Sequence, residues 1–158
     1  VPQVSYNGYL MQTGVKPVIT VPKGKPRADY TFSDKAYEYL DKITTLCSEN
    51  DVKLVLIKAP TLYPYWYEEW DNQMEDYAEE HQISYYNLLE AAEEAGIDYS
   101  TDTYDGGFHL NVFGAEKLST YFGSILVDNY GAETEKVDNS LKKYFEELTQ
   151  KYRKEKAE

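Results

Sequence analysis

The chain has 158 residues, a length typical of one domain, and 42% of them are apolar, which is enough for a hydrophobic core. Its net charge of −12 argues against binding to nucleic acid or to an anionic membrane surface, because both need clustered Lys and Arg. No apolar run approaches the roughly 20 residues of a membrane-spanning helix, and the single cysteine, Cys47, cannot form an internal disulfide.

The first 30 residues are expected to form an extended arm. Prolines and glycines interrupt every apolar run between Val1 and Arg27. The one regular element that we consider for this arm is a short strand over Val18–Val21. A domain does not usually begin this way, so residues 1–158 are interpreted as the C-terminal part of a larger domain in preference to the alternative, a single domain.

The α/β part is expected over residues 33–130, and it begins with an amphipathic helix. Ser33 is a good N-cap, and the helix is expected to end near Asn50. Apolar residues at three- and four-residue steps predict the face that this helix buries: Ala36, Tyr39, Leu40, Ile43, Leu46 and Cys47. Cys47 is therefore expected to be a buried structural thiol rather than a reactive one.

Two short strands with a helix between them predict a βαβ unit. Residues 52–59 form a mostly continuous, β-branched apolar run, which is typical of a buried parallel strand. An aromatic loop with two prolines follows over 60–67. The next helix has one apolar face, which consists of Trp66, Trp70, Met74, Tyr77 and Ala78. A second strand is expected over 83–86, and this spacing predicts parallel strands joined by a right-handed crossover.

Three more helices are expected in the rest of the chain. A short one is predicted over 88–95, and a long one, capped by Asn111, should end near Gly131. The last helix is predicted within 138–158, with a charged tail that frays from Lys151 onward. Its inward face is expected to consist of Leu141, Tyr144, Phe145, Leu148 and Tyr152.

The stretch Tyr104–Asn111 suggests acid–base chemistry. It contains His109, one of only two histidines, and Asp105 lies four residues before it with two glycines between them. An Asp can orient and charge-stabilise a His that acts as a general base. Glycines permit backbone conformations that let an acid and a base so close in sequence meet. We therefore expect an Asp105 carboxylate oxygen within about 3.2 Å of His109 Nδ1.

This stretch and its continuation, His-Leu-Asn-x-x-Gly-Ala-x-Lys-Leu-Ser, resemble the last motif block of the SGNH/GDSL hydrolases, in a form found in a group of bacterial members. The resemblance covers roughly residues 8–130. It implies a flavodoxin-like three-layer α/β fold with a parallel sheet, of which this chain holds the later half. It also implies His109 as the base and Asp105 as its partner in a Ser-His-Asp triad, with no cofactor and no metal.

Two features depart from the family pattern. Asp105 precedes His109 by four residues instead of the usual three, which leaves Asp102 as a competitor for the acid role. The Gly-Asp-Ser-like block that would carry the nucleophile is absent around every serine of the chain: Ser5, Ser33, Ser48, Ser84, Ser100, Ser119, Ser124 and Ser140. Of these, Ser33 and Ser140 are interpreted as helix caps. The nucleophilic serine is thus expected outside this chain, or lost from a degenerate scaffold.

Other candidate residues each have two interpretations. Lys58 ends the first strand, where α/β proteins bind ligands, and is either a contact for an anionic or carbonyl group or a plain strand-edge lysine. His81 is interpreted as a helix C-terminal cation in preference to a metal ligand. An acidic run on the second helix is either a catalytic carboxylate pair or a solvated face. Aromatic residues after the first strand either wall a substrate cleft or cover the sheet edge; they are Tyr63, Tyr65, Trp66 and Tyr67.

The function that the resemblance implies is ester chemistry. It would be hydrolysis or transfer of an acyl group, most simply acetyl, on a carbohydrate or cell-envelope polymer, in the envelope or exterior of a bacterium. The alternative is a non-catalytic glycan- or protein-binding module, which the 17 tyrosines would suit. The expected partners are an ester-bearing carbohydrate or another small acyl substrate, together with the severed N-terminal part or a second copy of the chain, because a few parallel strands leave an apolar edge exposed.

Overall fold

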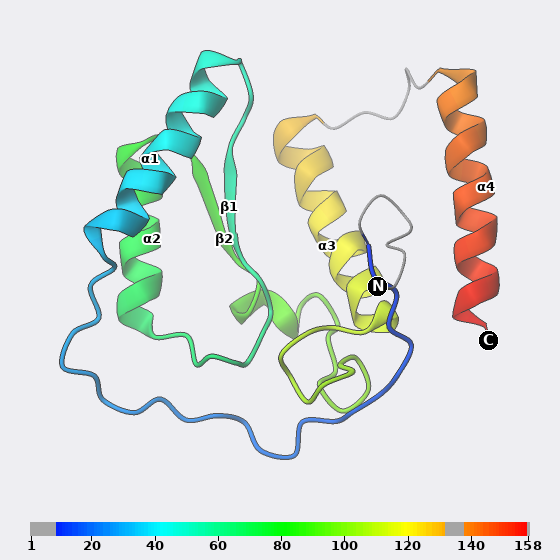
Figure 1. The fold of residues 1–158 in the computed structure, drawn as a ribbon, viewed down its shortest axis with the longest axis horizontal. Helices are drawn as coiled ribbons and strands as arrows, with labels where there is room; N and C mark the ends of the chain where they lie inside the picture. Colours follow the sequence, from blue (N-terminus) through cyan, green and yellow to red (C-terminus); the bar gives the residue numbers. More distant parts are fainter. Residues whose placement is uncertain (1–8, 132–137, 158) are drawn as a thin grey trace. The chain divides into compact units, whose positions relative to one another are not determined.

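The computed structural model describes residues 9–131 and 138–157. The chain divides into two compact units. Thr20–Ala92 is here called the sheet unit, and Val1–Ile19 together with Glu93–Glu158 is called the loop–helix unit. Helices combine with a parallel sheet, so the predicted α/β class is confirmed (Figure 1).

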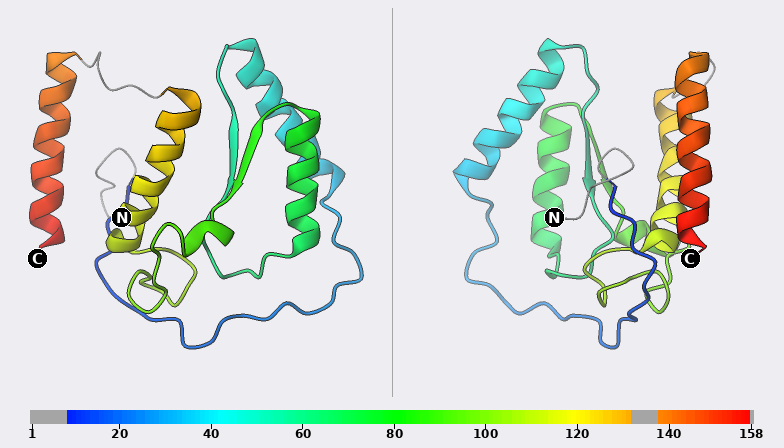
Figure 2. Two further views of the ribbon diagram at one scale, coloured as in Figure 1. Left: turned by 180° about the vertical axis from the view of Figure 1, so that it is seen from behind. Right: turned by 45° about the vertical axis from the view of Figure 1, so that its right-hand side comes forward.

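The sheet unit contains the predicted βαβ arrangement. Strand β1 (Val55–Lys58) pairs in parallel with β2 (Ser84–Asn87), and α2 (Glu68–Glu80) connects them. Helices α1 and α2 lie on the same side of the two strands in every view (Figures 1 and 2). Strand β1 is shorter than the predicted 52–59, because Val52 N donates to Cys47 O at 2.9 Å and so still belongs to the turn that ends α1.

Helix α1 (Asp34–Glu49) has the predicted bounds but not the predicted buried face. Its N-cap is Ser33, whose Oγ accepts from Ala36 N at 3.2 Å. None of its residues is buried, and four members of the expected apolar stripe are exposed: Ala36, Tyr39, Ile43 and Leu46. Cys47 is only half-buried, so its expected burial is wrong.

Contacts with α2 explain why α1 turns a different face inward. The Thr44 hydroxyl lies 3.0 Å from the Tyr77 hydroxyl, and the Tyr37 ring stacks near Tyr77 with centroids 6.0 Å apart. Asp41 accepts a hydrogen bond from Tyr77 at 2.9 Å. These polar and aromatic side chains are spaced by three and four residues along α1, so they form a second stripe that competes with the apolar one.

Two short elements predicted from the sequence are absent. Val18–Val21 forms no strand, because Val18 N donates to Tyr99 O, Thr20 O accepts from the Tyr63 hydroxyl instead of a neighbouring strand, and Ile19 is 94% exposed. Residues 88–95 form no α-helix, only turns and the 3-10 helix η2 (Glu90–Ala92). There the Asn87 side chain accepts from the amides of residues 89 and 90, which caps one turn directly after β2.

The loop–helix unit contributes two long helices. Helix α3 (Val112–Tyr130) begins at the predicted cap, Asn111, and ends at Gly131, which has the left-handed φ of 60° that favours glycine. Helix α4 (Asn139–Lys156) is capped by Asp138, whose side chain accepts from Ser140 N, so the interpretation of Ser140 as the cap is wrong.

The C-terminal half of α4 is held more firmly than the sequence suggested. Tyr152 donates to Glu116 Oε1 at 2.9 Å, and Lys156 pairs with the other oxygen of the same carboxylate. The helix consequently continues to Lys156 instead of fraying from Lys151; Glu158 lies outside the described residues. On the expected inward face, Leu148 and Tyr152 are half-buried, whereas three residues nearer the start of α4 are exposed: Leu141, Tyr144 and Phe145.

The sequence predicted no membrane-spanning helix. Within the parts of the chain that the structure describes, no helix combines the length and the apolar character needed to cross a bilayer.

Candidate acid–base site

The candidate site is the loop of residues 103–110, which leads into α3 and whose two ends pair with each other. Thr103 and Leu110 form an isolated antiparallel bridge, which brings the two ends of the loop together. Gly106 and Gly107 have φ angles of 81° and 105°, in the region that residues with a side chain rarely adopt. Gly107 N donates to the buried Thr103 hydroxyl at 2.8 Å. The two glycines are therefore required for the reversal of the chain within this loop.

Asp105 and His109 meet across that reversal. Asp105 Oδ2 lies 2.6 Å from His109 Nδ1, so the expected contact is present. Asp105 Oδ1 accepts from the backbone amides of Phe108, at 3.1 Å, and His109, at 2.8 Å. One carboxylate thus holds both the imidazole ring and the backbone that carries it. The two backbone bonds to Oδ1 explain how an acid four residues before the histidine can reach the ring.

The chemical state of His109 follows from this contact. A carboxylate at Nδ1 favours the tautomer with the proton on that nitrogen, which leaves Nε2 as an acceptor. The His109 side chain is 65% exposed, whereas that of Asp105 is only 28% exposed. The Tyr104 ring lies nearly parallel to the imidazole, with centroids 5.8 Å apart and planes inclined by 14°. The arrangement can accept a proton at Nε2 and stabilise the resulting imidazolium.

The pKa of Asp105 is lowered by the same contacts. Partial burial raises it, but the hydrogen bonds from the His109 side chain and backbone, the charge of the ring and the Phe108 amide together outweigh that effect. The pKa of Asp105 is lower in the folded than in the unfolded chain, so its carboxylate stabilises the folded loop above an unfolded-state pKa of about 4. This stabilisation is lost as the pH falls through the folded-state pKa.

We expect the replacement His109→Ala to raise the pKa of Asp105 toward its ordinary value, because the imidazole is the main group that lowers it. A ¹³C NMR titration of the side-chain carboxyl would measure this change. Asp98 is the internal control, since its pKa is lowered by hydrogen bonds from Ser100 and should not move. An Asp105 titration that is identical in both proteins would show that the ring contact has no electrostatic consequence.

Asp102, the competing acid, has a different role. It is 1% exposed, and its Oδ2 accepts from Lys117 Nζ at 2.6 Å and from Asp98 N at 2.8 Å. Its backbone oxygen accepts from Asn111 N at 2.9 Å. Asp102 therefore ties the start of the loop to α3, and Asp105 is the acid that contacts His109. Lys117, which the sequence did not single out for this role, neutralises the buried carboxylate from the second turn of α3.

Asn111 and the arm complete the support of the loop. Asn111 is fully buried, and its Oδ1 caps α3 by accepting from the amides of Phe113 and Gly114, both at 3.1 Å. Its Nδ2 donates to Gly14 O at 3.1 Å and to Thr101 O at 2.7 Å. The described part of the predicted extended arm is irregular, as expected. The arm is nonetheless attached to this site by backbone bonds at residues 12, 14 and 16.

The polar candidates of the sheet unit are occupied by contacts within the chain. The Lys58 ammonium donates to the backbone oxygens of Ala59 and Thr61 and to the Thr61 hydroxyl, and it lies 5.4 Å from the Trp66 ring centre. Burial lowers the pKa of Lys58, an effect that the charge of Asp71 opposes. These contacts favour a structural role for Lys58 over a ligand contact.

Asp71 was not distinguished from the rest of the acidic run by the sequence. It is 7% exposed, and its Oδ1 accepts from Trp66 Nε1, the Tyr85 hydroxyl and Asn87 Nδ2. The position of Asp71 in the helical pattern of α2 did not predict this burial. The three donors lie outside α2, in a loop and in β2. The other members of the run are exposed and fit a solvated face: Glu68, Glu69, Glu75 and Asp76.

The remaining candidates are placed as follows. His81 is the C-cap of α2, and its ring stacks on Tyr77 with centroids 4.1 Å apart. Ser119 and Ser124 lie on α3, and Ser5 lies outside the described residues. No serine of residues 9–131 or 138–157 forms a hydrogen bond with His109. The described residues also contain no group of three or more His, Cys, Asp or Glu side chains arranged to hold a metal ion.

No family model, curated protein or solved structure matches this chain. The likeness to the SGNH/GDSL hydrolases thus remains a prediction from the motif, and the contacts described above are the observations that bear on function.

Proposed function

We propose that this chain carries the acid–base part of an SGNH-type esterase or acyl transferase, with His109 as general base and Asp105 as the residue that orients and charge-stabilises it. The observation that supports this most is the 2.6 Å contact between Asp105 Oδ2 and His109 Nδ1. An exposed imidazole with one nitrogen held by a carboxylate can exchange a proton at the other nitrogen with an incoming hydroxyl.

In the proposed reaction, a serine hydroxyl from outside these 158 residues attacks the acyl carbon of an ester while His109 Nε2 takes the hydroxyl proton. His109 then gives that proton to the leaving oxygen, which departs as an alcohol. Water, or the hydroxyl of an acyl acceptor, next attacks the acyl-serine while His109 Nε2 takes its proton. The bond between the acyl carbon and the serine oxygen then breaks, His109 returns the proton to that oxygen, and the acid or the acylated acceptor is released. Asp105 stays ionised throughout.

The finer parts of the proposal rest on the motif resemblance. They are the three-layer SGNH arrangement, a carbohydrate or cell-envelope ester as substrate, and a location in the bacterial envelope or exterior. The parallel βαβ arrangement of the sheet unit is compatible with that fold.

The test uses a fluorophosphonate, which reacts with activated serines, on the complete gene product that contains this sequence. We expect one labelled serine, and labelling slowed about 100- to 10,000-fold by His109→Ala, the range that general acid–base catalysis contributes. Asp105→Asn should also slow labelling. His81→Ala removes the other histidine and is the matched control, which should label like the unaltered protein. Equal labelling of the His109→Ala and unaltered proteins would overturn the proposal.

The alternative is a non-catalytic glycan- or protein-binding module, and the aromatic cluster of the sheet unit supports it. Tyr67 and Trp66 both pack edge-to-face against Trp70, with centroids 4.7 and 5.5 Å apart, and Tyr65 is 40% exposed beside them. If the complete gene product shows no labelled serine, this alternative replaces the esterase proposal.

A further inference from the structure

Tyr104 contacts the imidazole of His109 but takes no part in the reaction proposed above. The two rings are nearly parallel, with centroids 5.8 Å apart and planes inclined by 14°. Aromatic rings at this separation and inclination form an offset stack. Tyr104 therefore lies along a face of the imidazole, whereas Asp105 contacts the edge of the ring at Nδ1.

The backbone on both sides of Tyr104 is fixed. Thr103 is fully buried, and its backbone oxygen accepts from Lys16 N at 2.8 Å. On the other side, Asp105 Oδ1 accepts from the backbone amide of His109 at 2.8 Å. Tyr104 is half-buried, whereas the His109 side chain is 65% exposed. The tyrosine is thus held more firmly in the loop than the imidazole is.

The Asp105 contact alone does not fix the direction in which His109 Nε2 points. A hydrogen bond at Nδ1 holds one corner of the imidazole, and the plane of the ring can still turn about that corner. Nε2 lies two bonds from Nδ1, so a turn of the plane displaces it. A reacting group that is misplaced by about 1 Å can lose roughly 100-fold in rate. The base therefore needs a second contact that fixes the plane of its ring.

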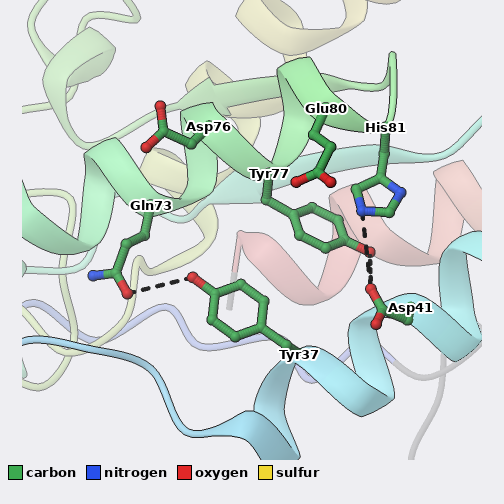
Figure 3. Close-up of a pocket in the computed structure, with 7 residues that line it drawn as sticks. All are labelled: Tyr37, Asp41, Gln73, Asp76, Tyr77, Glu80 and His81. Atoms are coloured by element: carbon green, nitrogen blue, oxygen red, sulfur yellow. Dashed lines mark hydrogen bonds and ion pairs between the residues drawn. The ribbon is translucent and has the colours of Figure 1, made fainter.

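The other histidine, His81, has the same two kinds of neighbour in a different arrangement (Figure 3). Its ring stacks on Tyr77 with centroids 4.1 Å apart, and its Nε2 lies 3.9 Å from Asp41 Oδ1, which is too far for a hydrogen bond. That carboxylate oxygen accepts from the Tyr77 hydroxyl instead. Of the two histidines, His109 alone combines a stacked tyrosine with a hydrogen-bonded carboxylate, and its Nε2 has no hydrogen-bond partner among the described residues.

We propose that Tyr104 is the positioning residue of His109, because its ring face fixes the plane of the imidazole and so the direction of Nε2. This inference rests on the proposed function of His109 as a base. The face of Tyr104 also attracts the imidazolium that forms when Nε2 takes a proton, because the two centroids lie within the roughly 6 Å over which an aromatic face stabilises a cation. Tyr104 thus supports the ring most strongly in the state that follows proton transfer.

The ring of Tyr104, and not its hydroxyl, has this role. Among the described residues, the hydroxyl of Tyr104 has no hydrogen-bond partner. Tyr104→Phe keeps the ring face and removes only the oxygen, so it should behave like the unaltered protein. Tyr104→Leu keeps an apolar side chain without a ring face, so it should lose the stack.

The first test is fluorophosphonate labelling of the complete gene product. We expect Tyr104→Leu to slow labelling about three- to tenfold, the factor that corresponds to the loss of one aromatic pair, and Tyr104→Phe to label within about 1.5-fold of the unaltered protein. Tyr144→Leu is the matched control, because it removes an exposed tyrosine of α4, and it should leave labelling unchanged. Equal slowing by the two Tyr104 variants would overturn the proposal, since the hydroxyl would then be the active group. Slowing by His109→Ala without slowing by Tyr104→Leu would overturn it as well.

A second test does not depend on catalysis. Relaxation of ¹³C in the Cδ2–Hδ2 bond measures the order of each histidine ring on the picosecond-to-nanosecond timescale, and the His109 signal is identified by its loss in His109→Ala. We expect Tyr104→Leu to lower the order parameter of the His109 ring and Tyr104→Phe to preserve it, while His81 stays unchanged in the same spectra. An unchanged His109 ring in Tyr104→Leu would overturn the proposal. If His109→Ala fails to slow labelling, the esterase proposal is wrong, and the order of the ring then decides separately whether Tyr104 positions it.

Discussion

The replacement Asn111→Ala is expected to destabilise the loop–helix unit by about 3–4 kcal/mol, because four hydrogen bonds depend on this one side chain. Alanine would leave the first amides of α3 without a cap and would leave Gly14 O and Thr101 O without donors. Asn111 is fully buried, so little water can replace the lost contacts. Hydrogen exchange of the α3 amides would measure the loss.

The cap of α4 provides the control for this experiment. Asp138 also caps a long helix, but it is exposed and makes a single capping bond, to Ser140 N at 2.8 Å. Asp138→Ala should therefore cost only about 1 kcal/mol, the usual value of an N-cap. Similar losses of stability in the two alanine variants would show that Asn111 acts only as a helix cap. The hydrogen bonds that connect it to the arm and the loop would then contribute little.

Asn111→Asp distinguishes these two roles in another way. Aspartate is as good an N-cap as asparagine, so it keeps the two acceptor bonds. It cannot donate to Gly14 O or Thr101 O, however, and it would place a carboxylate against two carbonyl oxygens in a buried position. We expect this variant to be as unstable as Asn111→Ala. A stability close to that of the unaltered chain would contradict the proposed importance of the two Nδ2 bonds.

The motif predicted the acid–base pair because its determinants are local. Gly106 and Gly107 reverse the chain between Asp105 and His109, and the bond from His109 N to Asp105 Oδ1 lies within the same loop. Helix caps are local as well, which is why Ser33 and Asn111 were predicted correctly. Whether this pair carries out the predicted chemistry depends on a serine that the described residues do not place beside it.

The features that the sequence did not reveal depend on contacts between distant segments. The hydrogen bonds of Asp71 come from a loop and a strand, and the charged partner of Asp102 is Lys117 of α3. Helix α1 shows the same limit, because its apolar stripe predicted one buried face while bonds to Tyr77 selected another. Hydrophobic periodicity identifies a helix, but the partners available in the fold decide which face it uses.

Gly114→Ala and Gly123→Ala are expected to change stability in opposite directions, although both add one methyl group to α3. A Cβ on Gly114 would lie 2.6 Å from Asp102 O and 2.9 Å from Asp102 Cβ, well inside contact distance. That oxygen cannot move freely, because it accepts from Asn111 N. Gly114→Ala should therefore cost about 1–3 kcal/mol, the usual penalty of overpacking.

Nothing lies within 4 Å of a Cβ on Gly123, in the interior of the same helix. Gly123→Ala should stabilise α3 by about 0.5–1 kcal/mol, because alanine loses less backbone entropy on folding than glycine does. Urea unfolding followed by circular dichroism would measure both variants. Equal effects would mean that α3 does not approach the loop as closely as the Gly114 contact requires. A cost confined to Gly114 would show that the glycine of His-Leu-Asn-x-x-Gly is needed for close packing of α3 against the loop that carries His109.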